Sequence, residues 1–318
     1  ENYPLNTLIY TLDNGLKVYM SVNKDEPRIQ TNIAVNTGSK QDPADATGLA
    51  HYLEHMLFKG TSEISTINWE EEQKLLKQIS DLYEKRRDVV NEDDRKAIYH
   101  QIDSISLLAA EYAVPNEYDK MISSLGAKGT NAYTSLERTV YVNDIPSNEF
   151  EKWLTIESER FSELVLRLFH TELETVYEEF NRAQDNDWRL SHYTMMNALF
   201  KKHSYGTQTT LGTSEHLKNP SLKEMYDFYR RYYVPGNMAI AISGDVNINE
   251  AIERIDIEFS RWRPAQVLPK PKWKEPAIKE IERVSVPYRG EEYVLLAFRT
   301  APGGHKDAET LEVLDMIL

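Results

Sequence analysis

Two histidines and a glutamate interrupt an otherwise apolar segment, Gly48–Phe58. The apolar residues of this segment recur with helical spacing. On a helix, His51 and His55 lie one turn apart on the same face, so both imidazoles can reach one metal ion. Glu54 lies close to this face. The alternative is that the three polar groups share a helix by accident, since a lone histidine on a helix is usually structural. Their clustering in an apolar helix favours a metal site.

A catalytic metal site needs a third protein ligand and an open position. Glu172 and Glu179 are separated by two helical turns, so they share one face of the helix predicted at residues 172–185. Glu179 would bind the metal, and Glu172 would orient a ligand through a hydrogen bond. Glu174 and Glu178 are also nearby. Considered alone, this segment is therefore better explained as a solvated acidic helix face.

The composition excludes several classes of function. The chain has no cysteine, which rules out disulfides, thiol catalysis and cysteine-ligated metal sites. Its formal net charge of −14 argues against a nucleic-acid-binding role, because phosphate recognition needs a basic surface. No run of about 18 apolar residues occurs, so no membrane span is expected. The chain begins at Glu1, which fits either a removed signal peptide or a trimmed sequence.

The hydrophobic pattern predicts a mixture of strands and helices. Asp13-Asn14-Gly15 predicts the turn of a first β-hairpin. The charged stretch at residues 68–112 has almost no glycine or proline and predicts a helical hairpin that turns near Asn91. The predicted strands lie within residues 8–22, 29–35, 127–143, 238–243 and 284–299, and the further helices lie at 150–168, 172–185, 246–259 and 309–318.

Four prolines between Arg263 and Ala277 predict a stiff, extended linker. The expected domains are residues 1–262, a linker at 263–278, and the incomplete start of a second domain at 279–318. The order of strand, glycine turn, polar loop and helix at residues 29–57 recurs at residues 293–318, with the packing residues kept and the candidate ligands lost. This recurrence predicts a second, metal-free copy, although two amphipathic helices can also match by coincidence.

A series of motifs follows one another between about Leu8 and Asp245: HYLEH, MLFKGT, GTNAYTS, ERTVYVNDIP, two glutamates spaced as E-x6-E, YGTQTTLGT and YYVPGNMAIAISGDV. This series resembles the pitrilysin/insulinase family of zinc peptidases, especially bacterial periplasmic-type members with a long helical insertion. The resemblance implies an α+β fold of the mitochondrial-processing-peptidase type, in which helices pack a mainly antiparallel sheet. It implies a tandem repeat with the second copy truncated, and favours a periplasmic or cell-envelope location over a cytoplasmic one.

The resemblance also implies a role for each candidate residue. His51, His55 and Glu179 would bind one Zn²⁺ per chain, and Glu54 would be the general base that activates a zinc-bound water. Glu172 would be the outer glutamate that orients a ligand. The substrate would pair by strand addition with the backbone of Asn131, Ala132 and Tyr133, which on the sequence alone fit an ordinary strand.

The function implied by the resemblance is a zinc-dependent endopeptidase that hydrolyses peptides or small unfolded proteins. Family members complete the site with an Arg and a Tyr from elsewhere, so full activity is expected to need a missing C-terminal half or a partner subunit. A non-catalytic or partner-dependent scaffold or substrate-binding subunit is the alternative, although such subunits usually lose the ligands. A quorum-signal lyase with H-x-x-E-H is excluded because its third ligand is a cysteine. The long interval from His55 to Glu179 is explained if residues 68–112 are an insertion.

Overall fold

The computed structural model describes residues 6–287 and 289–317. These residues form two compact units. The first consists of residues up to Asn181 together with Gln208–Pro271, and the second of Arg182–Thr207 together with residues from Lys272 onward. The first unit holds the whole described sheet and every residue of the candidate site.

A mixed sheet of six strands forms the centre of the first unit, in the order β1-β2-β6-β3-β5-β4. Every neighbouring pair is antiparallel except β2 and β6, which run parallel. The predicted α+β fold with a mainly antiparallel sheet is therefore confirmed. The strands are β1 (Leu8–Thr11), β2 (Lys17–Val22), β3 (Arg28–Val35), β4 (Lys128–Thr134), β5 (Thr139–Pro146) and β6 (Met238–Gly244).

The core lies where the apolar residues of the central strands meet the helices. Alternate residues of β3 and β6 point into this core, and Ile33 and Ile240 are almost fully buried. Two helices, α1 (Leu49–Met56) and α5 (Phe150–Arg160), pack against β5, and α11 (Ile248–Phe259) packs against α5. The helix that carries the candidate histidines is thus fixed directly on the sheet.

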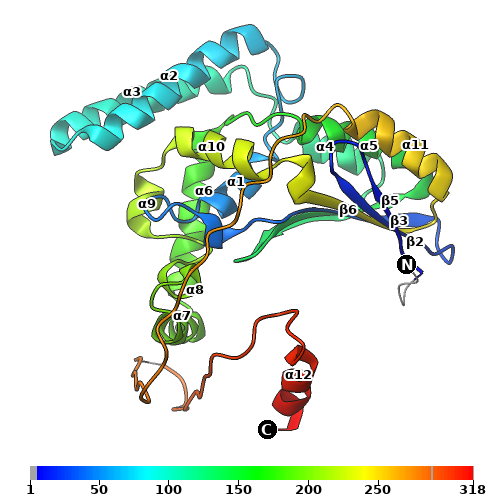
Figure 1. Ribbon diagram of the computed structural model, residues 1–318. Helices are drawn as coiled ribbons and strands as arrows, with labels where there is room; N and C mark the ends of the chain where they lie inside the picture. The colour runs from blue at the N-terminus through cyan, green and yellow to red at the C-terminus, as the bar shows by residue number, and fades with distance from the viewer. Residues whose placement is uncertain (1–5, 288, 318) are drawn as a thin grey trace. The chain divides into compact units, whose positions relative to one another are not determined.

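A pair of long helices, α2 (Trp69–Asp88) and α3 (Glu92–Ala110), forms the predicted helical hairpin (Figure 1). Each begins at an asparagine whose side chain accepts hydrogen bonds from backbone N–H groups of the first turn, Asn68 for α2 and Asn91 for α3. The hairpin packs against α10 (Leu222–Tyr232) through α2.

The remaining helices are shorter or belong to the second unit. The first unit contains α4 (Glu117–Ser124), most of α6 (Phe169–Gln184) and α9 (Ser214–Lys218), and the second unit contains α7 (Asp187–Leu199), α8 (Ser204–Thr207) and α12 (Ala308–Ile317). Helix α12 agrees with the helix predicted at residues 309–318, of which Leu318 lies outside the described residues. No helix in the described part of the chain has the length and apolar character needed to cross a membrane.

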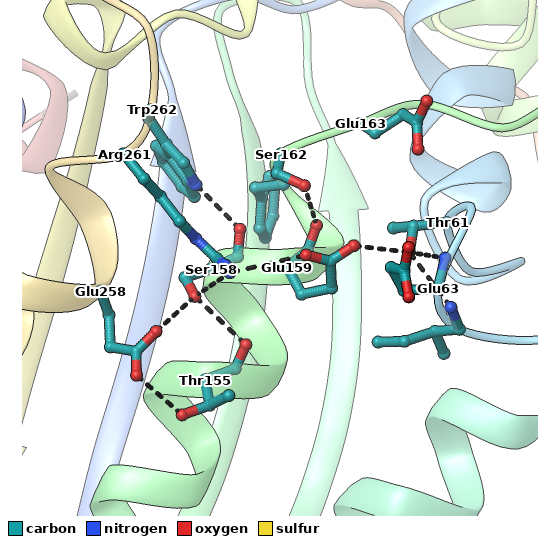
Figure 2. Close-up of polar contacts among 12 residues, drawn as sticks. Thr61, Glu63, Thr155, Ser158, Glu159, Ser162, Glu163, Glu258, Arg261 and Trp262 are labelled. Atoms are coloured by element: carbon teal, nitrogen blue, oxygen red, sulfur yellow. Dashed lines mark hydrogen bonds and ion pairs between the residues drawn. The ribbon is translucent and has the colours of Figure 1, made fainter.

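A polar junction joins α5 to α11 and to the residues that follow α11 (Figure 2). Glu258 accepts hydrogen bonds from Thr155 Oγ1 at 2.9 Å and from Ser158 Oγ at 3.1 Å. Trp262 Nε1 donates to the backbone oxygen of Ser158 at 2.8 Å, and this bond is buried. On the other side of α5, Glu159 accepts a hydrogen bond from Thr61 Oγ1, in the loop that follows α1. The junction therefore connects α5 and α11 to the loop that follows α1, the helix that carries the candidate histidines.

The helix predicted at residues 150–168 is wrong in its second half, because α5 ends at Arg160. Leu164, Val165 and Leu166 continue the apolar pattern, but they are buried in a non-helical segment. At the end of this segment Leu168 has φ +55°, outside the helical range. The segment brings the guanidinium of Arg167 to a buried carboxylate, a contact that apolar periodicity cannot reveal.

The strands predicted at residues 284–299 are also wrong. No strand forms there among the described residues, and residue 288 lies outside them. The side chains of Val294, Leu296 and Phe298 are largely exposed. A strand needs a partner for its backbone hydrogen bonds, and none of the described strands of the sheet pairs with this segment. The division into residues 1–262, 263–278 and 279–318 stays a prediction.

Candidate metal centre

Helix α1 buries one face in the core and presents its two histidines on the other. Leu53 and Met56 are fully buried in the apolar core of the first unit. His51 Nε2 and His55 Nε2 lie 3.3 Å apart, as the spacing of one helical turn predicts. The Tyr52 hydroxyl donates to the backbone oxygen of Phe169 at 2.6 Å, which ties α1 to the start of α6. The histidine face of α1 is thereby held beside α6.

The third candidate ligand comes from α6. Glu179 Oε2 lies 3.5 Å from His51 Nε2 and 3.7 Å from His55 Nε2. In a tetrahedral zinc site with bonds of about 2.0–2.1 Å, neighbouring ligand atoms are about 3.3–3.4 Å apart. The spacings of the three atoms are therefore close to those of one face of such a tetrahedron, and a zinc ion held there would keep a fourth position for water or substrate. In the described part of the chain, this is the one group of three or more such side chains whose ligand atoms converge in this way.

Glu172 lies on the Nδ1 side of the His55 ring. Glu172 Oε1 is 2.8 Å from His55 Nδ1, so the hydrogen bond places the proton on Nδ1 and leaves the Nε2 lone pair for a metal. Burial alone would lower the pKa of His55, but the hydrogen bond and charge of Glu172 outweigh it and raise that pKa. Burial alone would raise the pKa of Glu172, but hydrogen bonds from His55 and Lys59 hold it below its usual value.

Glu54 is buried beside the ligand group. Thr134 Oγ1, at the end of β4, donates a hydrogen bond to Glu54 Oε2 at 2.5 Å. Burial raises the pKa of Glu54, and the charge of Glu179 adds to this effect, while the Thr134 hydrogen bond and the charge of His55 oppose it. A carboxyl group with a raised pKa that is held by a single hydroxyl is suited to accept a proton and return it.

The start of α1 is shaped by two glycines and an aspartate. Gly48 has φ +87°, and a Cβ there would come within 2.8 Å of the backbone oxygen of Leu211. Gly212, with φ +73°, is packed more closely still, because a Cβ there would lie 2.2 Å from the backbone oxygen of Thr47. Asp42 accepts hydrogen bonds from the N–H groups of Gly48 at 2.8 Å and Ala50 at 2.9 Å. The YGTQTTLGT segment and Asp42 together fix the first turn of the metal helix.

We expect Asp42 to make the stability of the metal-free chain depend on pH. Burial raises the pKa of Asp42 from its ordinary 3.8 to about 8, although backbone hydrogen bonds oppose the shift. The folded state then binds one more proton than the unfolded state between these values, so this contribution is complete below about pH 4 and is lost as the pH rises through about 8. The free energy of unfolding is measured by chemical denaturation at several pH values from 4 to 8. We expect that of the unmutated chain to fall by a few kcal/mol relative to that of Asp42→Asn over this range.

The control for this prediction is Asp45→Asn, since Asp45 lies on the same loop with an exposed side chain. The difference in unfolding free energy between the unmutated chain and Asp45→Asn is expected to stay nearly constant across the same pH range. A similarly constant difference for Asp42→Asn would contradict the assignment.

The three residues expected to bind substrate lie on β4, at the edge of the sheet. Asn131, Ala132 and Tyr133 pair with β5 on one side of the strand, and no described strand pairs with β4 on the other. Tyr133 is 44% exposed, while Ala132 packs against the core. Because Thr134 follows directly and contacts Glu54, the open edge of β4 ends beside the candidate base.

Several residues around the centre were not identified from the sequence. Thr134 directly follows the predicted substrate stretch, and its period-two alternation with Ala132 was the available signal. Lys59 lies four residues after His55, and Asp42 lies in the polar loop that precedes the helix of the histidines. The partner of Arg167, Glu72, is distant in sequence, and no local pattern indicates it. These residues support the candidate ligands and are not themselves part of the ligand pattern.

Comparison with known proteins shows the family. The profile described as Insulinase (Peptidase family M16) matches residues 17–83 and 90–213, and the profile described as Peptidase M16 inactive domain matches residues 220–318. The first match contains every candidate site residue, and the second contains none. The fold and the matched profiles thus define a peptidase-type chain. It belongs to the insulinase family, which confirms the resemblance to pitrilysin/insulinase peptidases.

Individual relatives are similar at low identity. The chain is 24% identical to the zinc protease PqqE of Helicobacter pylori over 97% of its own length and 60% of that protein. The crystal structure of a protease from Helicobacter pylori matches with a TM-score of 0.65 and 24% identity, over 85% of this chain and 54% of that chain. The crystal structure of the periplasmic protease PqqL from Escherichia coli matches with a TM-score of 0.65 and 21% identity, over 87% of this chain and 26% of that chain. The chain spans less than two thirds of each of these proteins.

Proposed function

We propose that this chain is the catalytic portion of a zinc-dependent endopeptidase that acts on peptides or small unfolded proteins. The observation that carries the proposal is the convergence of His51 Nε2, His55 Nε2 and Glu179 Oε2 at spacings that fit a zinc tetrahedron, with Glu54 buried beside them. Relatives named as zinc proteases support it. The proposed cofactor is one Zn²⁺ per chain.

The chain's own residues would divide the chemistry between them. When bound, zinc would polarise the scissile carbonyl and lower the pKa of water at the open position to about 7. Glu54 accepts the proton of the attacking water and later donates it to the leaving amine. Thr134 holds the carboxylate of Glu54 in place through its hydroxyl hydrogen bond. Glu172 keeps the ring of His55 in the tautomer that leaves Nε2 unprotonated.

The substrate would bind as an added strand. The free edge of β4 offers backbone N–H and C=O groups to an extended peptide, and Asn131, Ala132 and Tyr133 supply that edge next to Glu54. Recognition through the backbone requires an extended substrate and depends little on side-chain sequence. This favours peptides and unfolded chains over folded proteins.

The complete active site would include a further subdomain or a partner subunit of the same family. This rests on the fact that the chain spans only 60% of PqqE and 54% of the solved Helicobacter pylori protease. The second candidate function is a partner-dependent, substrate-binding subunit that holds zinc and cleaves only in the assembled protein. The description of PqqL as a periplasmic protease supports a periplasmic or cell-envelope location for this protein.

Removal and return of zinc tests the proposal. Zinc content is measured by mass spectrometry on the purified chain, and cleavage of a fluorogenic unstructured peptide is followed before and after treatment with a chelator. We expect about one zinc per chain and, in whichever assembly the chain is active, loss of cleavage on chelation and recovery when zinc is restored. Zinc binding without cleavage by the chain alone would favour the partner-dependent subunit, and a chain that takes up no zinc would contradict both candidates.

A further inference from the structure

Lys59 joins the candidate metal centre from the residues just after α1. Lys59 Nζ lies 2.5 Å from Glu172 Oε2, and the two side chains are 22% and 11% exposed. The other oxygen of the same carboxylate is bonded to His55 Nδ1. Both oxygens of Glu172 therefore have a cationic or N–H donor, which fixes the rotation of the carboxylate as well as its position.

The backbone of Lys59 is itself held by a buried ion pair. Arg167 Nη1 donates to the backbone oxygen of Lys59 at 2.8 Å, and its other N–H groups reach the oxygens of Thr61 and Ile64. Arg167 also forms two hydrogen bonds, of 2.6 and 2.8 Å, with the carboxylate of Glu72 on α2. Both side chains of this pair are at most 1% exposed. Such a pair is rigid, because breaking it leaves a buried charge without a partner.

The two connections bring together the helices that carry the ligands. Arg167 lies two residues before α6, and it binds the loop that leaves α1. The side chain of Lys59, anchored in that loop, then reaches Glu172 on the first turns of α6. The contacts form a continuous series from the Glu72–Arg167 pair through Lys59 and Glu172 to the ring of His55.

We propose that Lys59 is a positioning residue of the metal centre, which fixes the Glu172 carboxylate and through it the His55 ring, with the Glu72–Arg167 pair as its anchor. The inference rests on the proposed zinc site. Removing a partner that orients a ligating histidine typically lowers metal affinity by about 10–100-fold. We expect a loss of roughly this size when Glu172 is no longer held in its orientation. Lys59 touches neither the metal position nor Glu54 in the described contacts, so its effect must pass through Glu172.

The test compares zinc affinity among lysine variants. Zinc dissociation constants are measured by competition with a chromophoric chelator for the unmutated chain, Lys59→Met and Lys59→Arg. We expect Lys59→Met to bind zinc on the order of 10–100-fold more weakly and Lys59→Arg to recover much of the loss, since Arg keeps the charge and the donor groups. The matched control is Lys74→Met on α2, which removes an exposed lysine paired with Glu71.

A second readout separates positioning from general destabilisation. The visible absorption of the Co²⁺-substituted chain reports ligand geometry, so it should change in Lys59→Met and stay unchanged in Lys74→Met, whose affinity should also be unaltered. Lys59→Gln replaces Lys59→Met if the latter does not fold. Zinc affinity within twofold of the unmutated chain, with an unchanged Co²⁺ spectrum, would overturn the role of Lys59. Failure of the unmutated chain to bind zinc would instead overturn the proposed function, and this inference with it.

Discussion

Glu54→Gln is expected to reduce peptide hydrolysis by a factor on the order of 10²–10⁴ while zinc stays bound, the range that a positioned general acid–base group contributes. The amide has nearly the shape of the carboxylate and can still accept the hydrogen bond from Thr134, but it cannot take a proton from water. The measurements are the hydrolysis rate and the zinc content of the same preparation, in whichever assembly the unmutated chain is active.

The control for Glu54→Gln is Glu63→Gln, because Glu63 is an exposed acid in the loop that follows the same helix. It should leave both the hydrolysis rate and the zinc content unchanged. Retention of hydrolysis by Glu54→Gln would show that another group activates water. Loss of zinc from Glu54→Gln would show that the side chain acts as a ligand instead of as a base.

Much of the centre could be predicted because local geometry determines it. The spacing of His51 and His55 is a property of the α-helix, and the structure places their Nε2 atoms 3.3 Å apart. The pairing of Glu172 and Glu179 on one face follows from the same periodicity. What periodicity could not decide was whether that face meets solvent or α1, since both outcomes require the same pattern. Only the tertiary contacts between α1 and α6 bring Glu179 to the histidines.

The parts of the fold that failed prediction depend on partners remote in sequence. Apolar spacing at residues 150–168 fits a helix, but the buried Glu72–Arg167 pair accompanies an irregular path for the second half. Alternation at residues 284–299 fits strands, but a strand forms only where another strand accepts its hydrogen bonds. The positioning role proposed for Lys59 belongs to the same class, because its contact with Glu172 spans more than a hundred residues.

Glu179→Gln should weaken zinc binding more than any substitution outside the ligand group, by more than the 10–100-fold typical of residues that only support a ligand. An amide oxygen carries no net charge, and it leaves the two histidines as the remaining protein ligands at a site that needs three. Zinc affinity is measured by the same chelator competition, and the metal content of the variant after dialysis is compared with about one zinc in the unmutated chain. The matched control is Glu178→Gln, which removes the same charge from the exposed neighbouring position of α6. If both variants bind zinc like the unmutated chain, the acidic face of α6 is solvated surface and the third ligand must lie elsewhere. If only Glu179→Gln loses affinity, position along the helix decides the effect and overall charge does not.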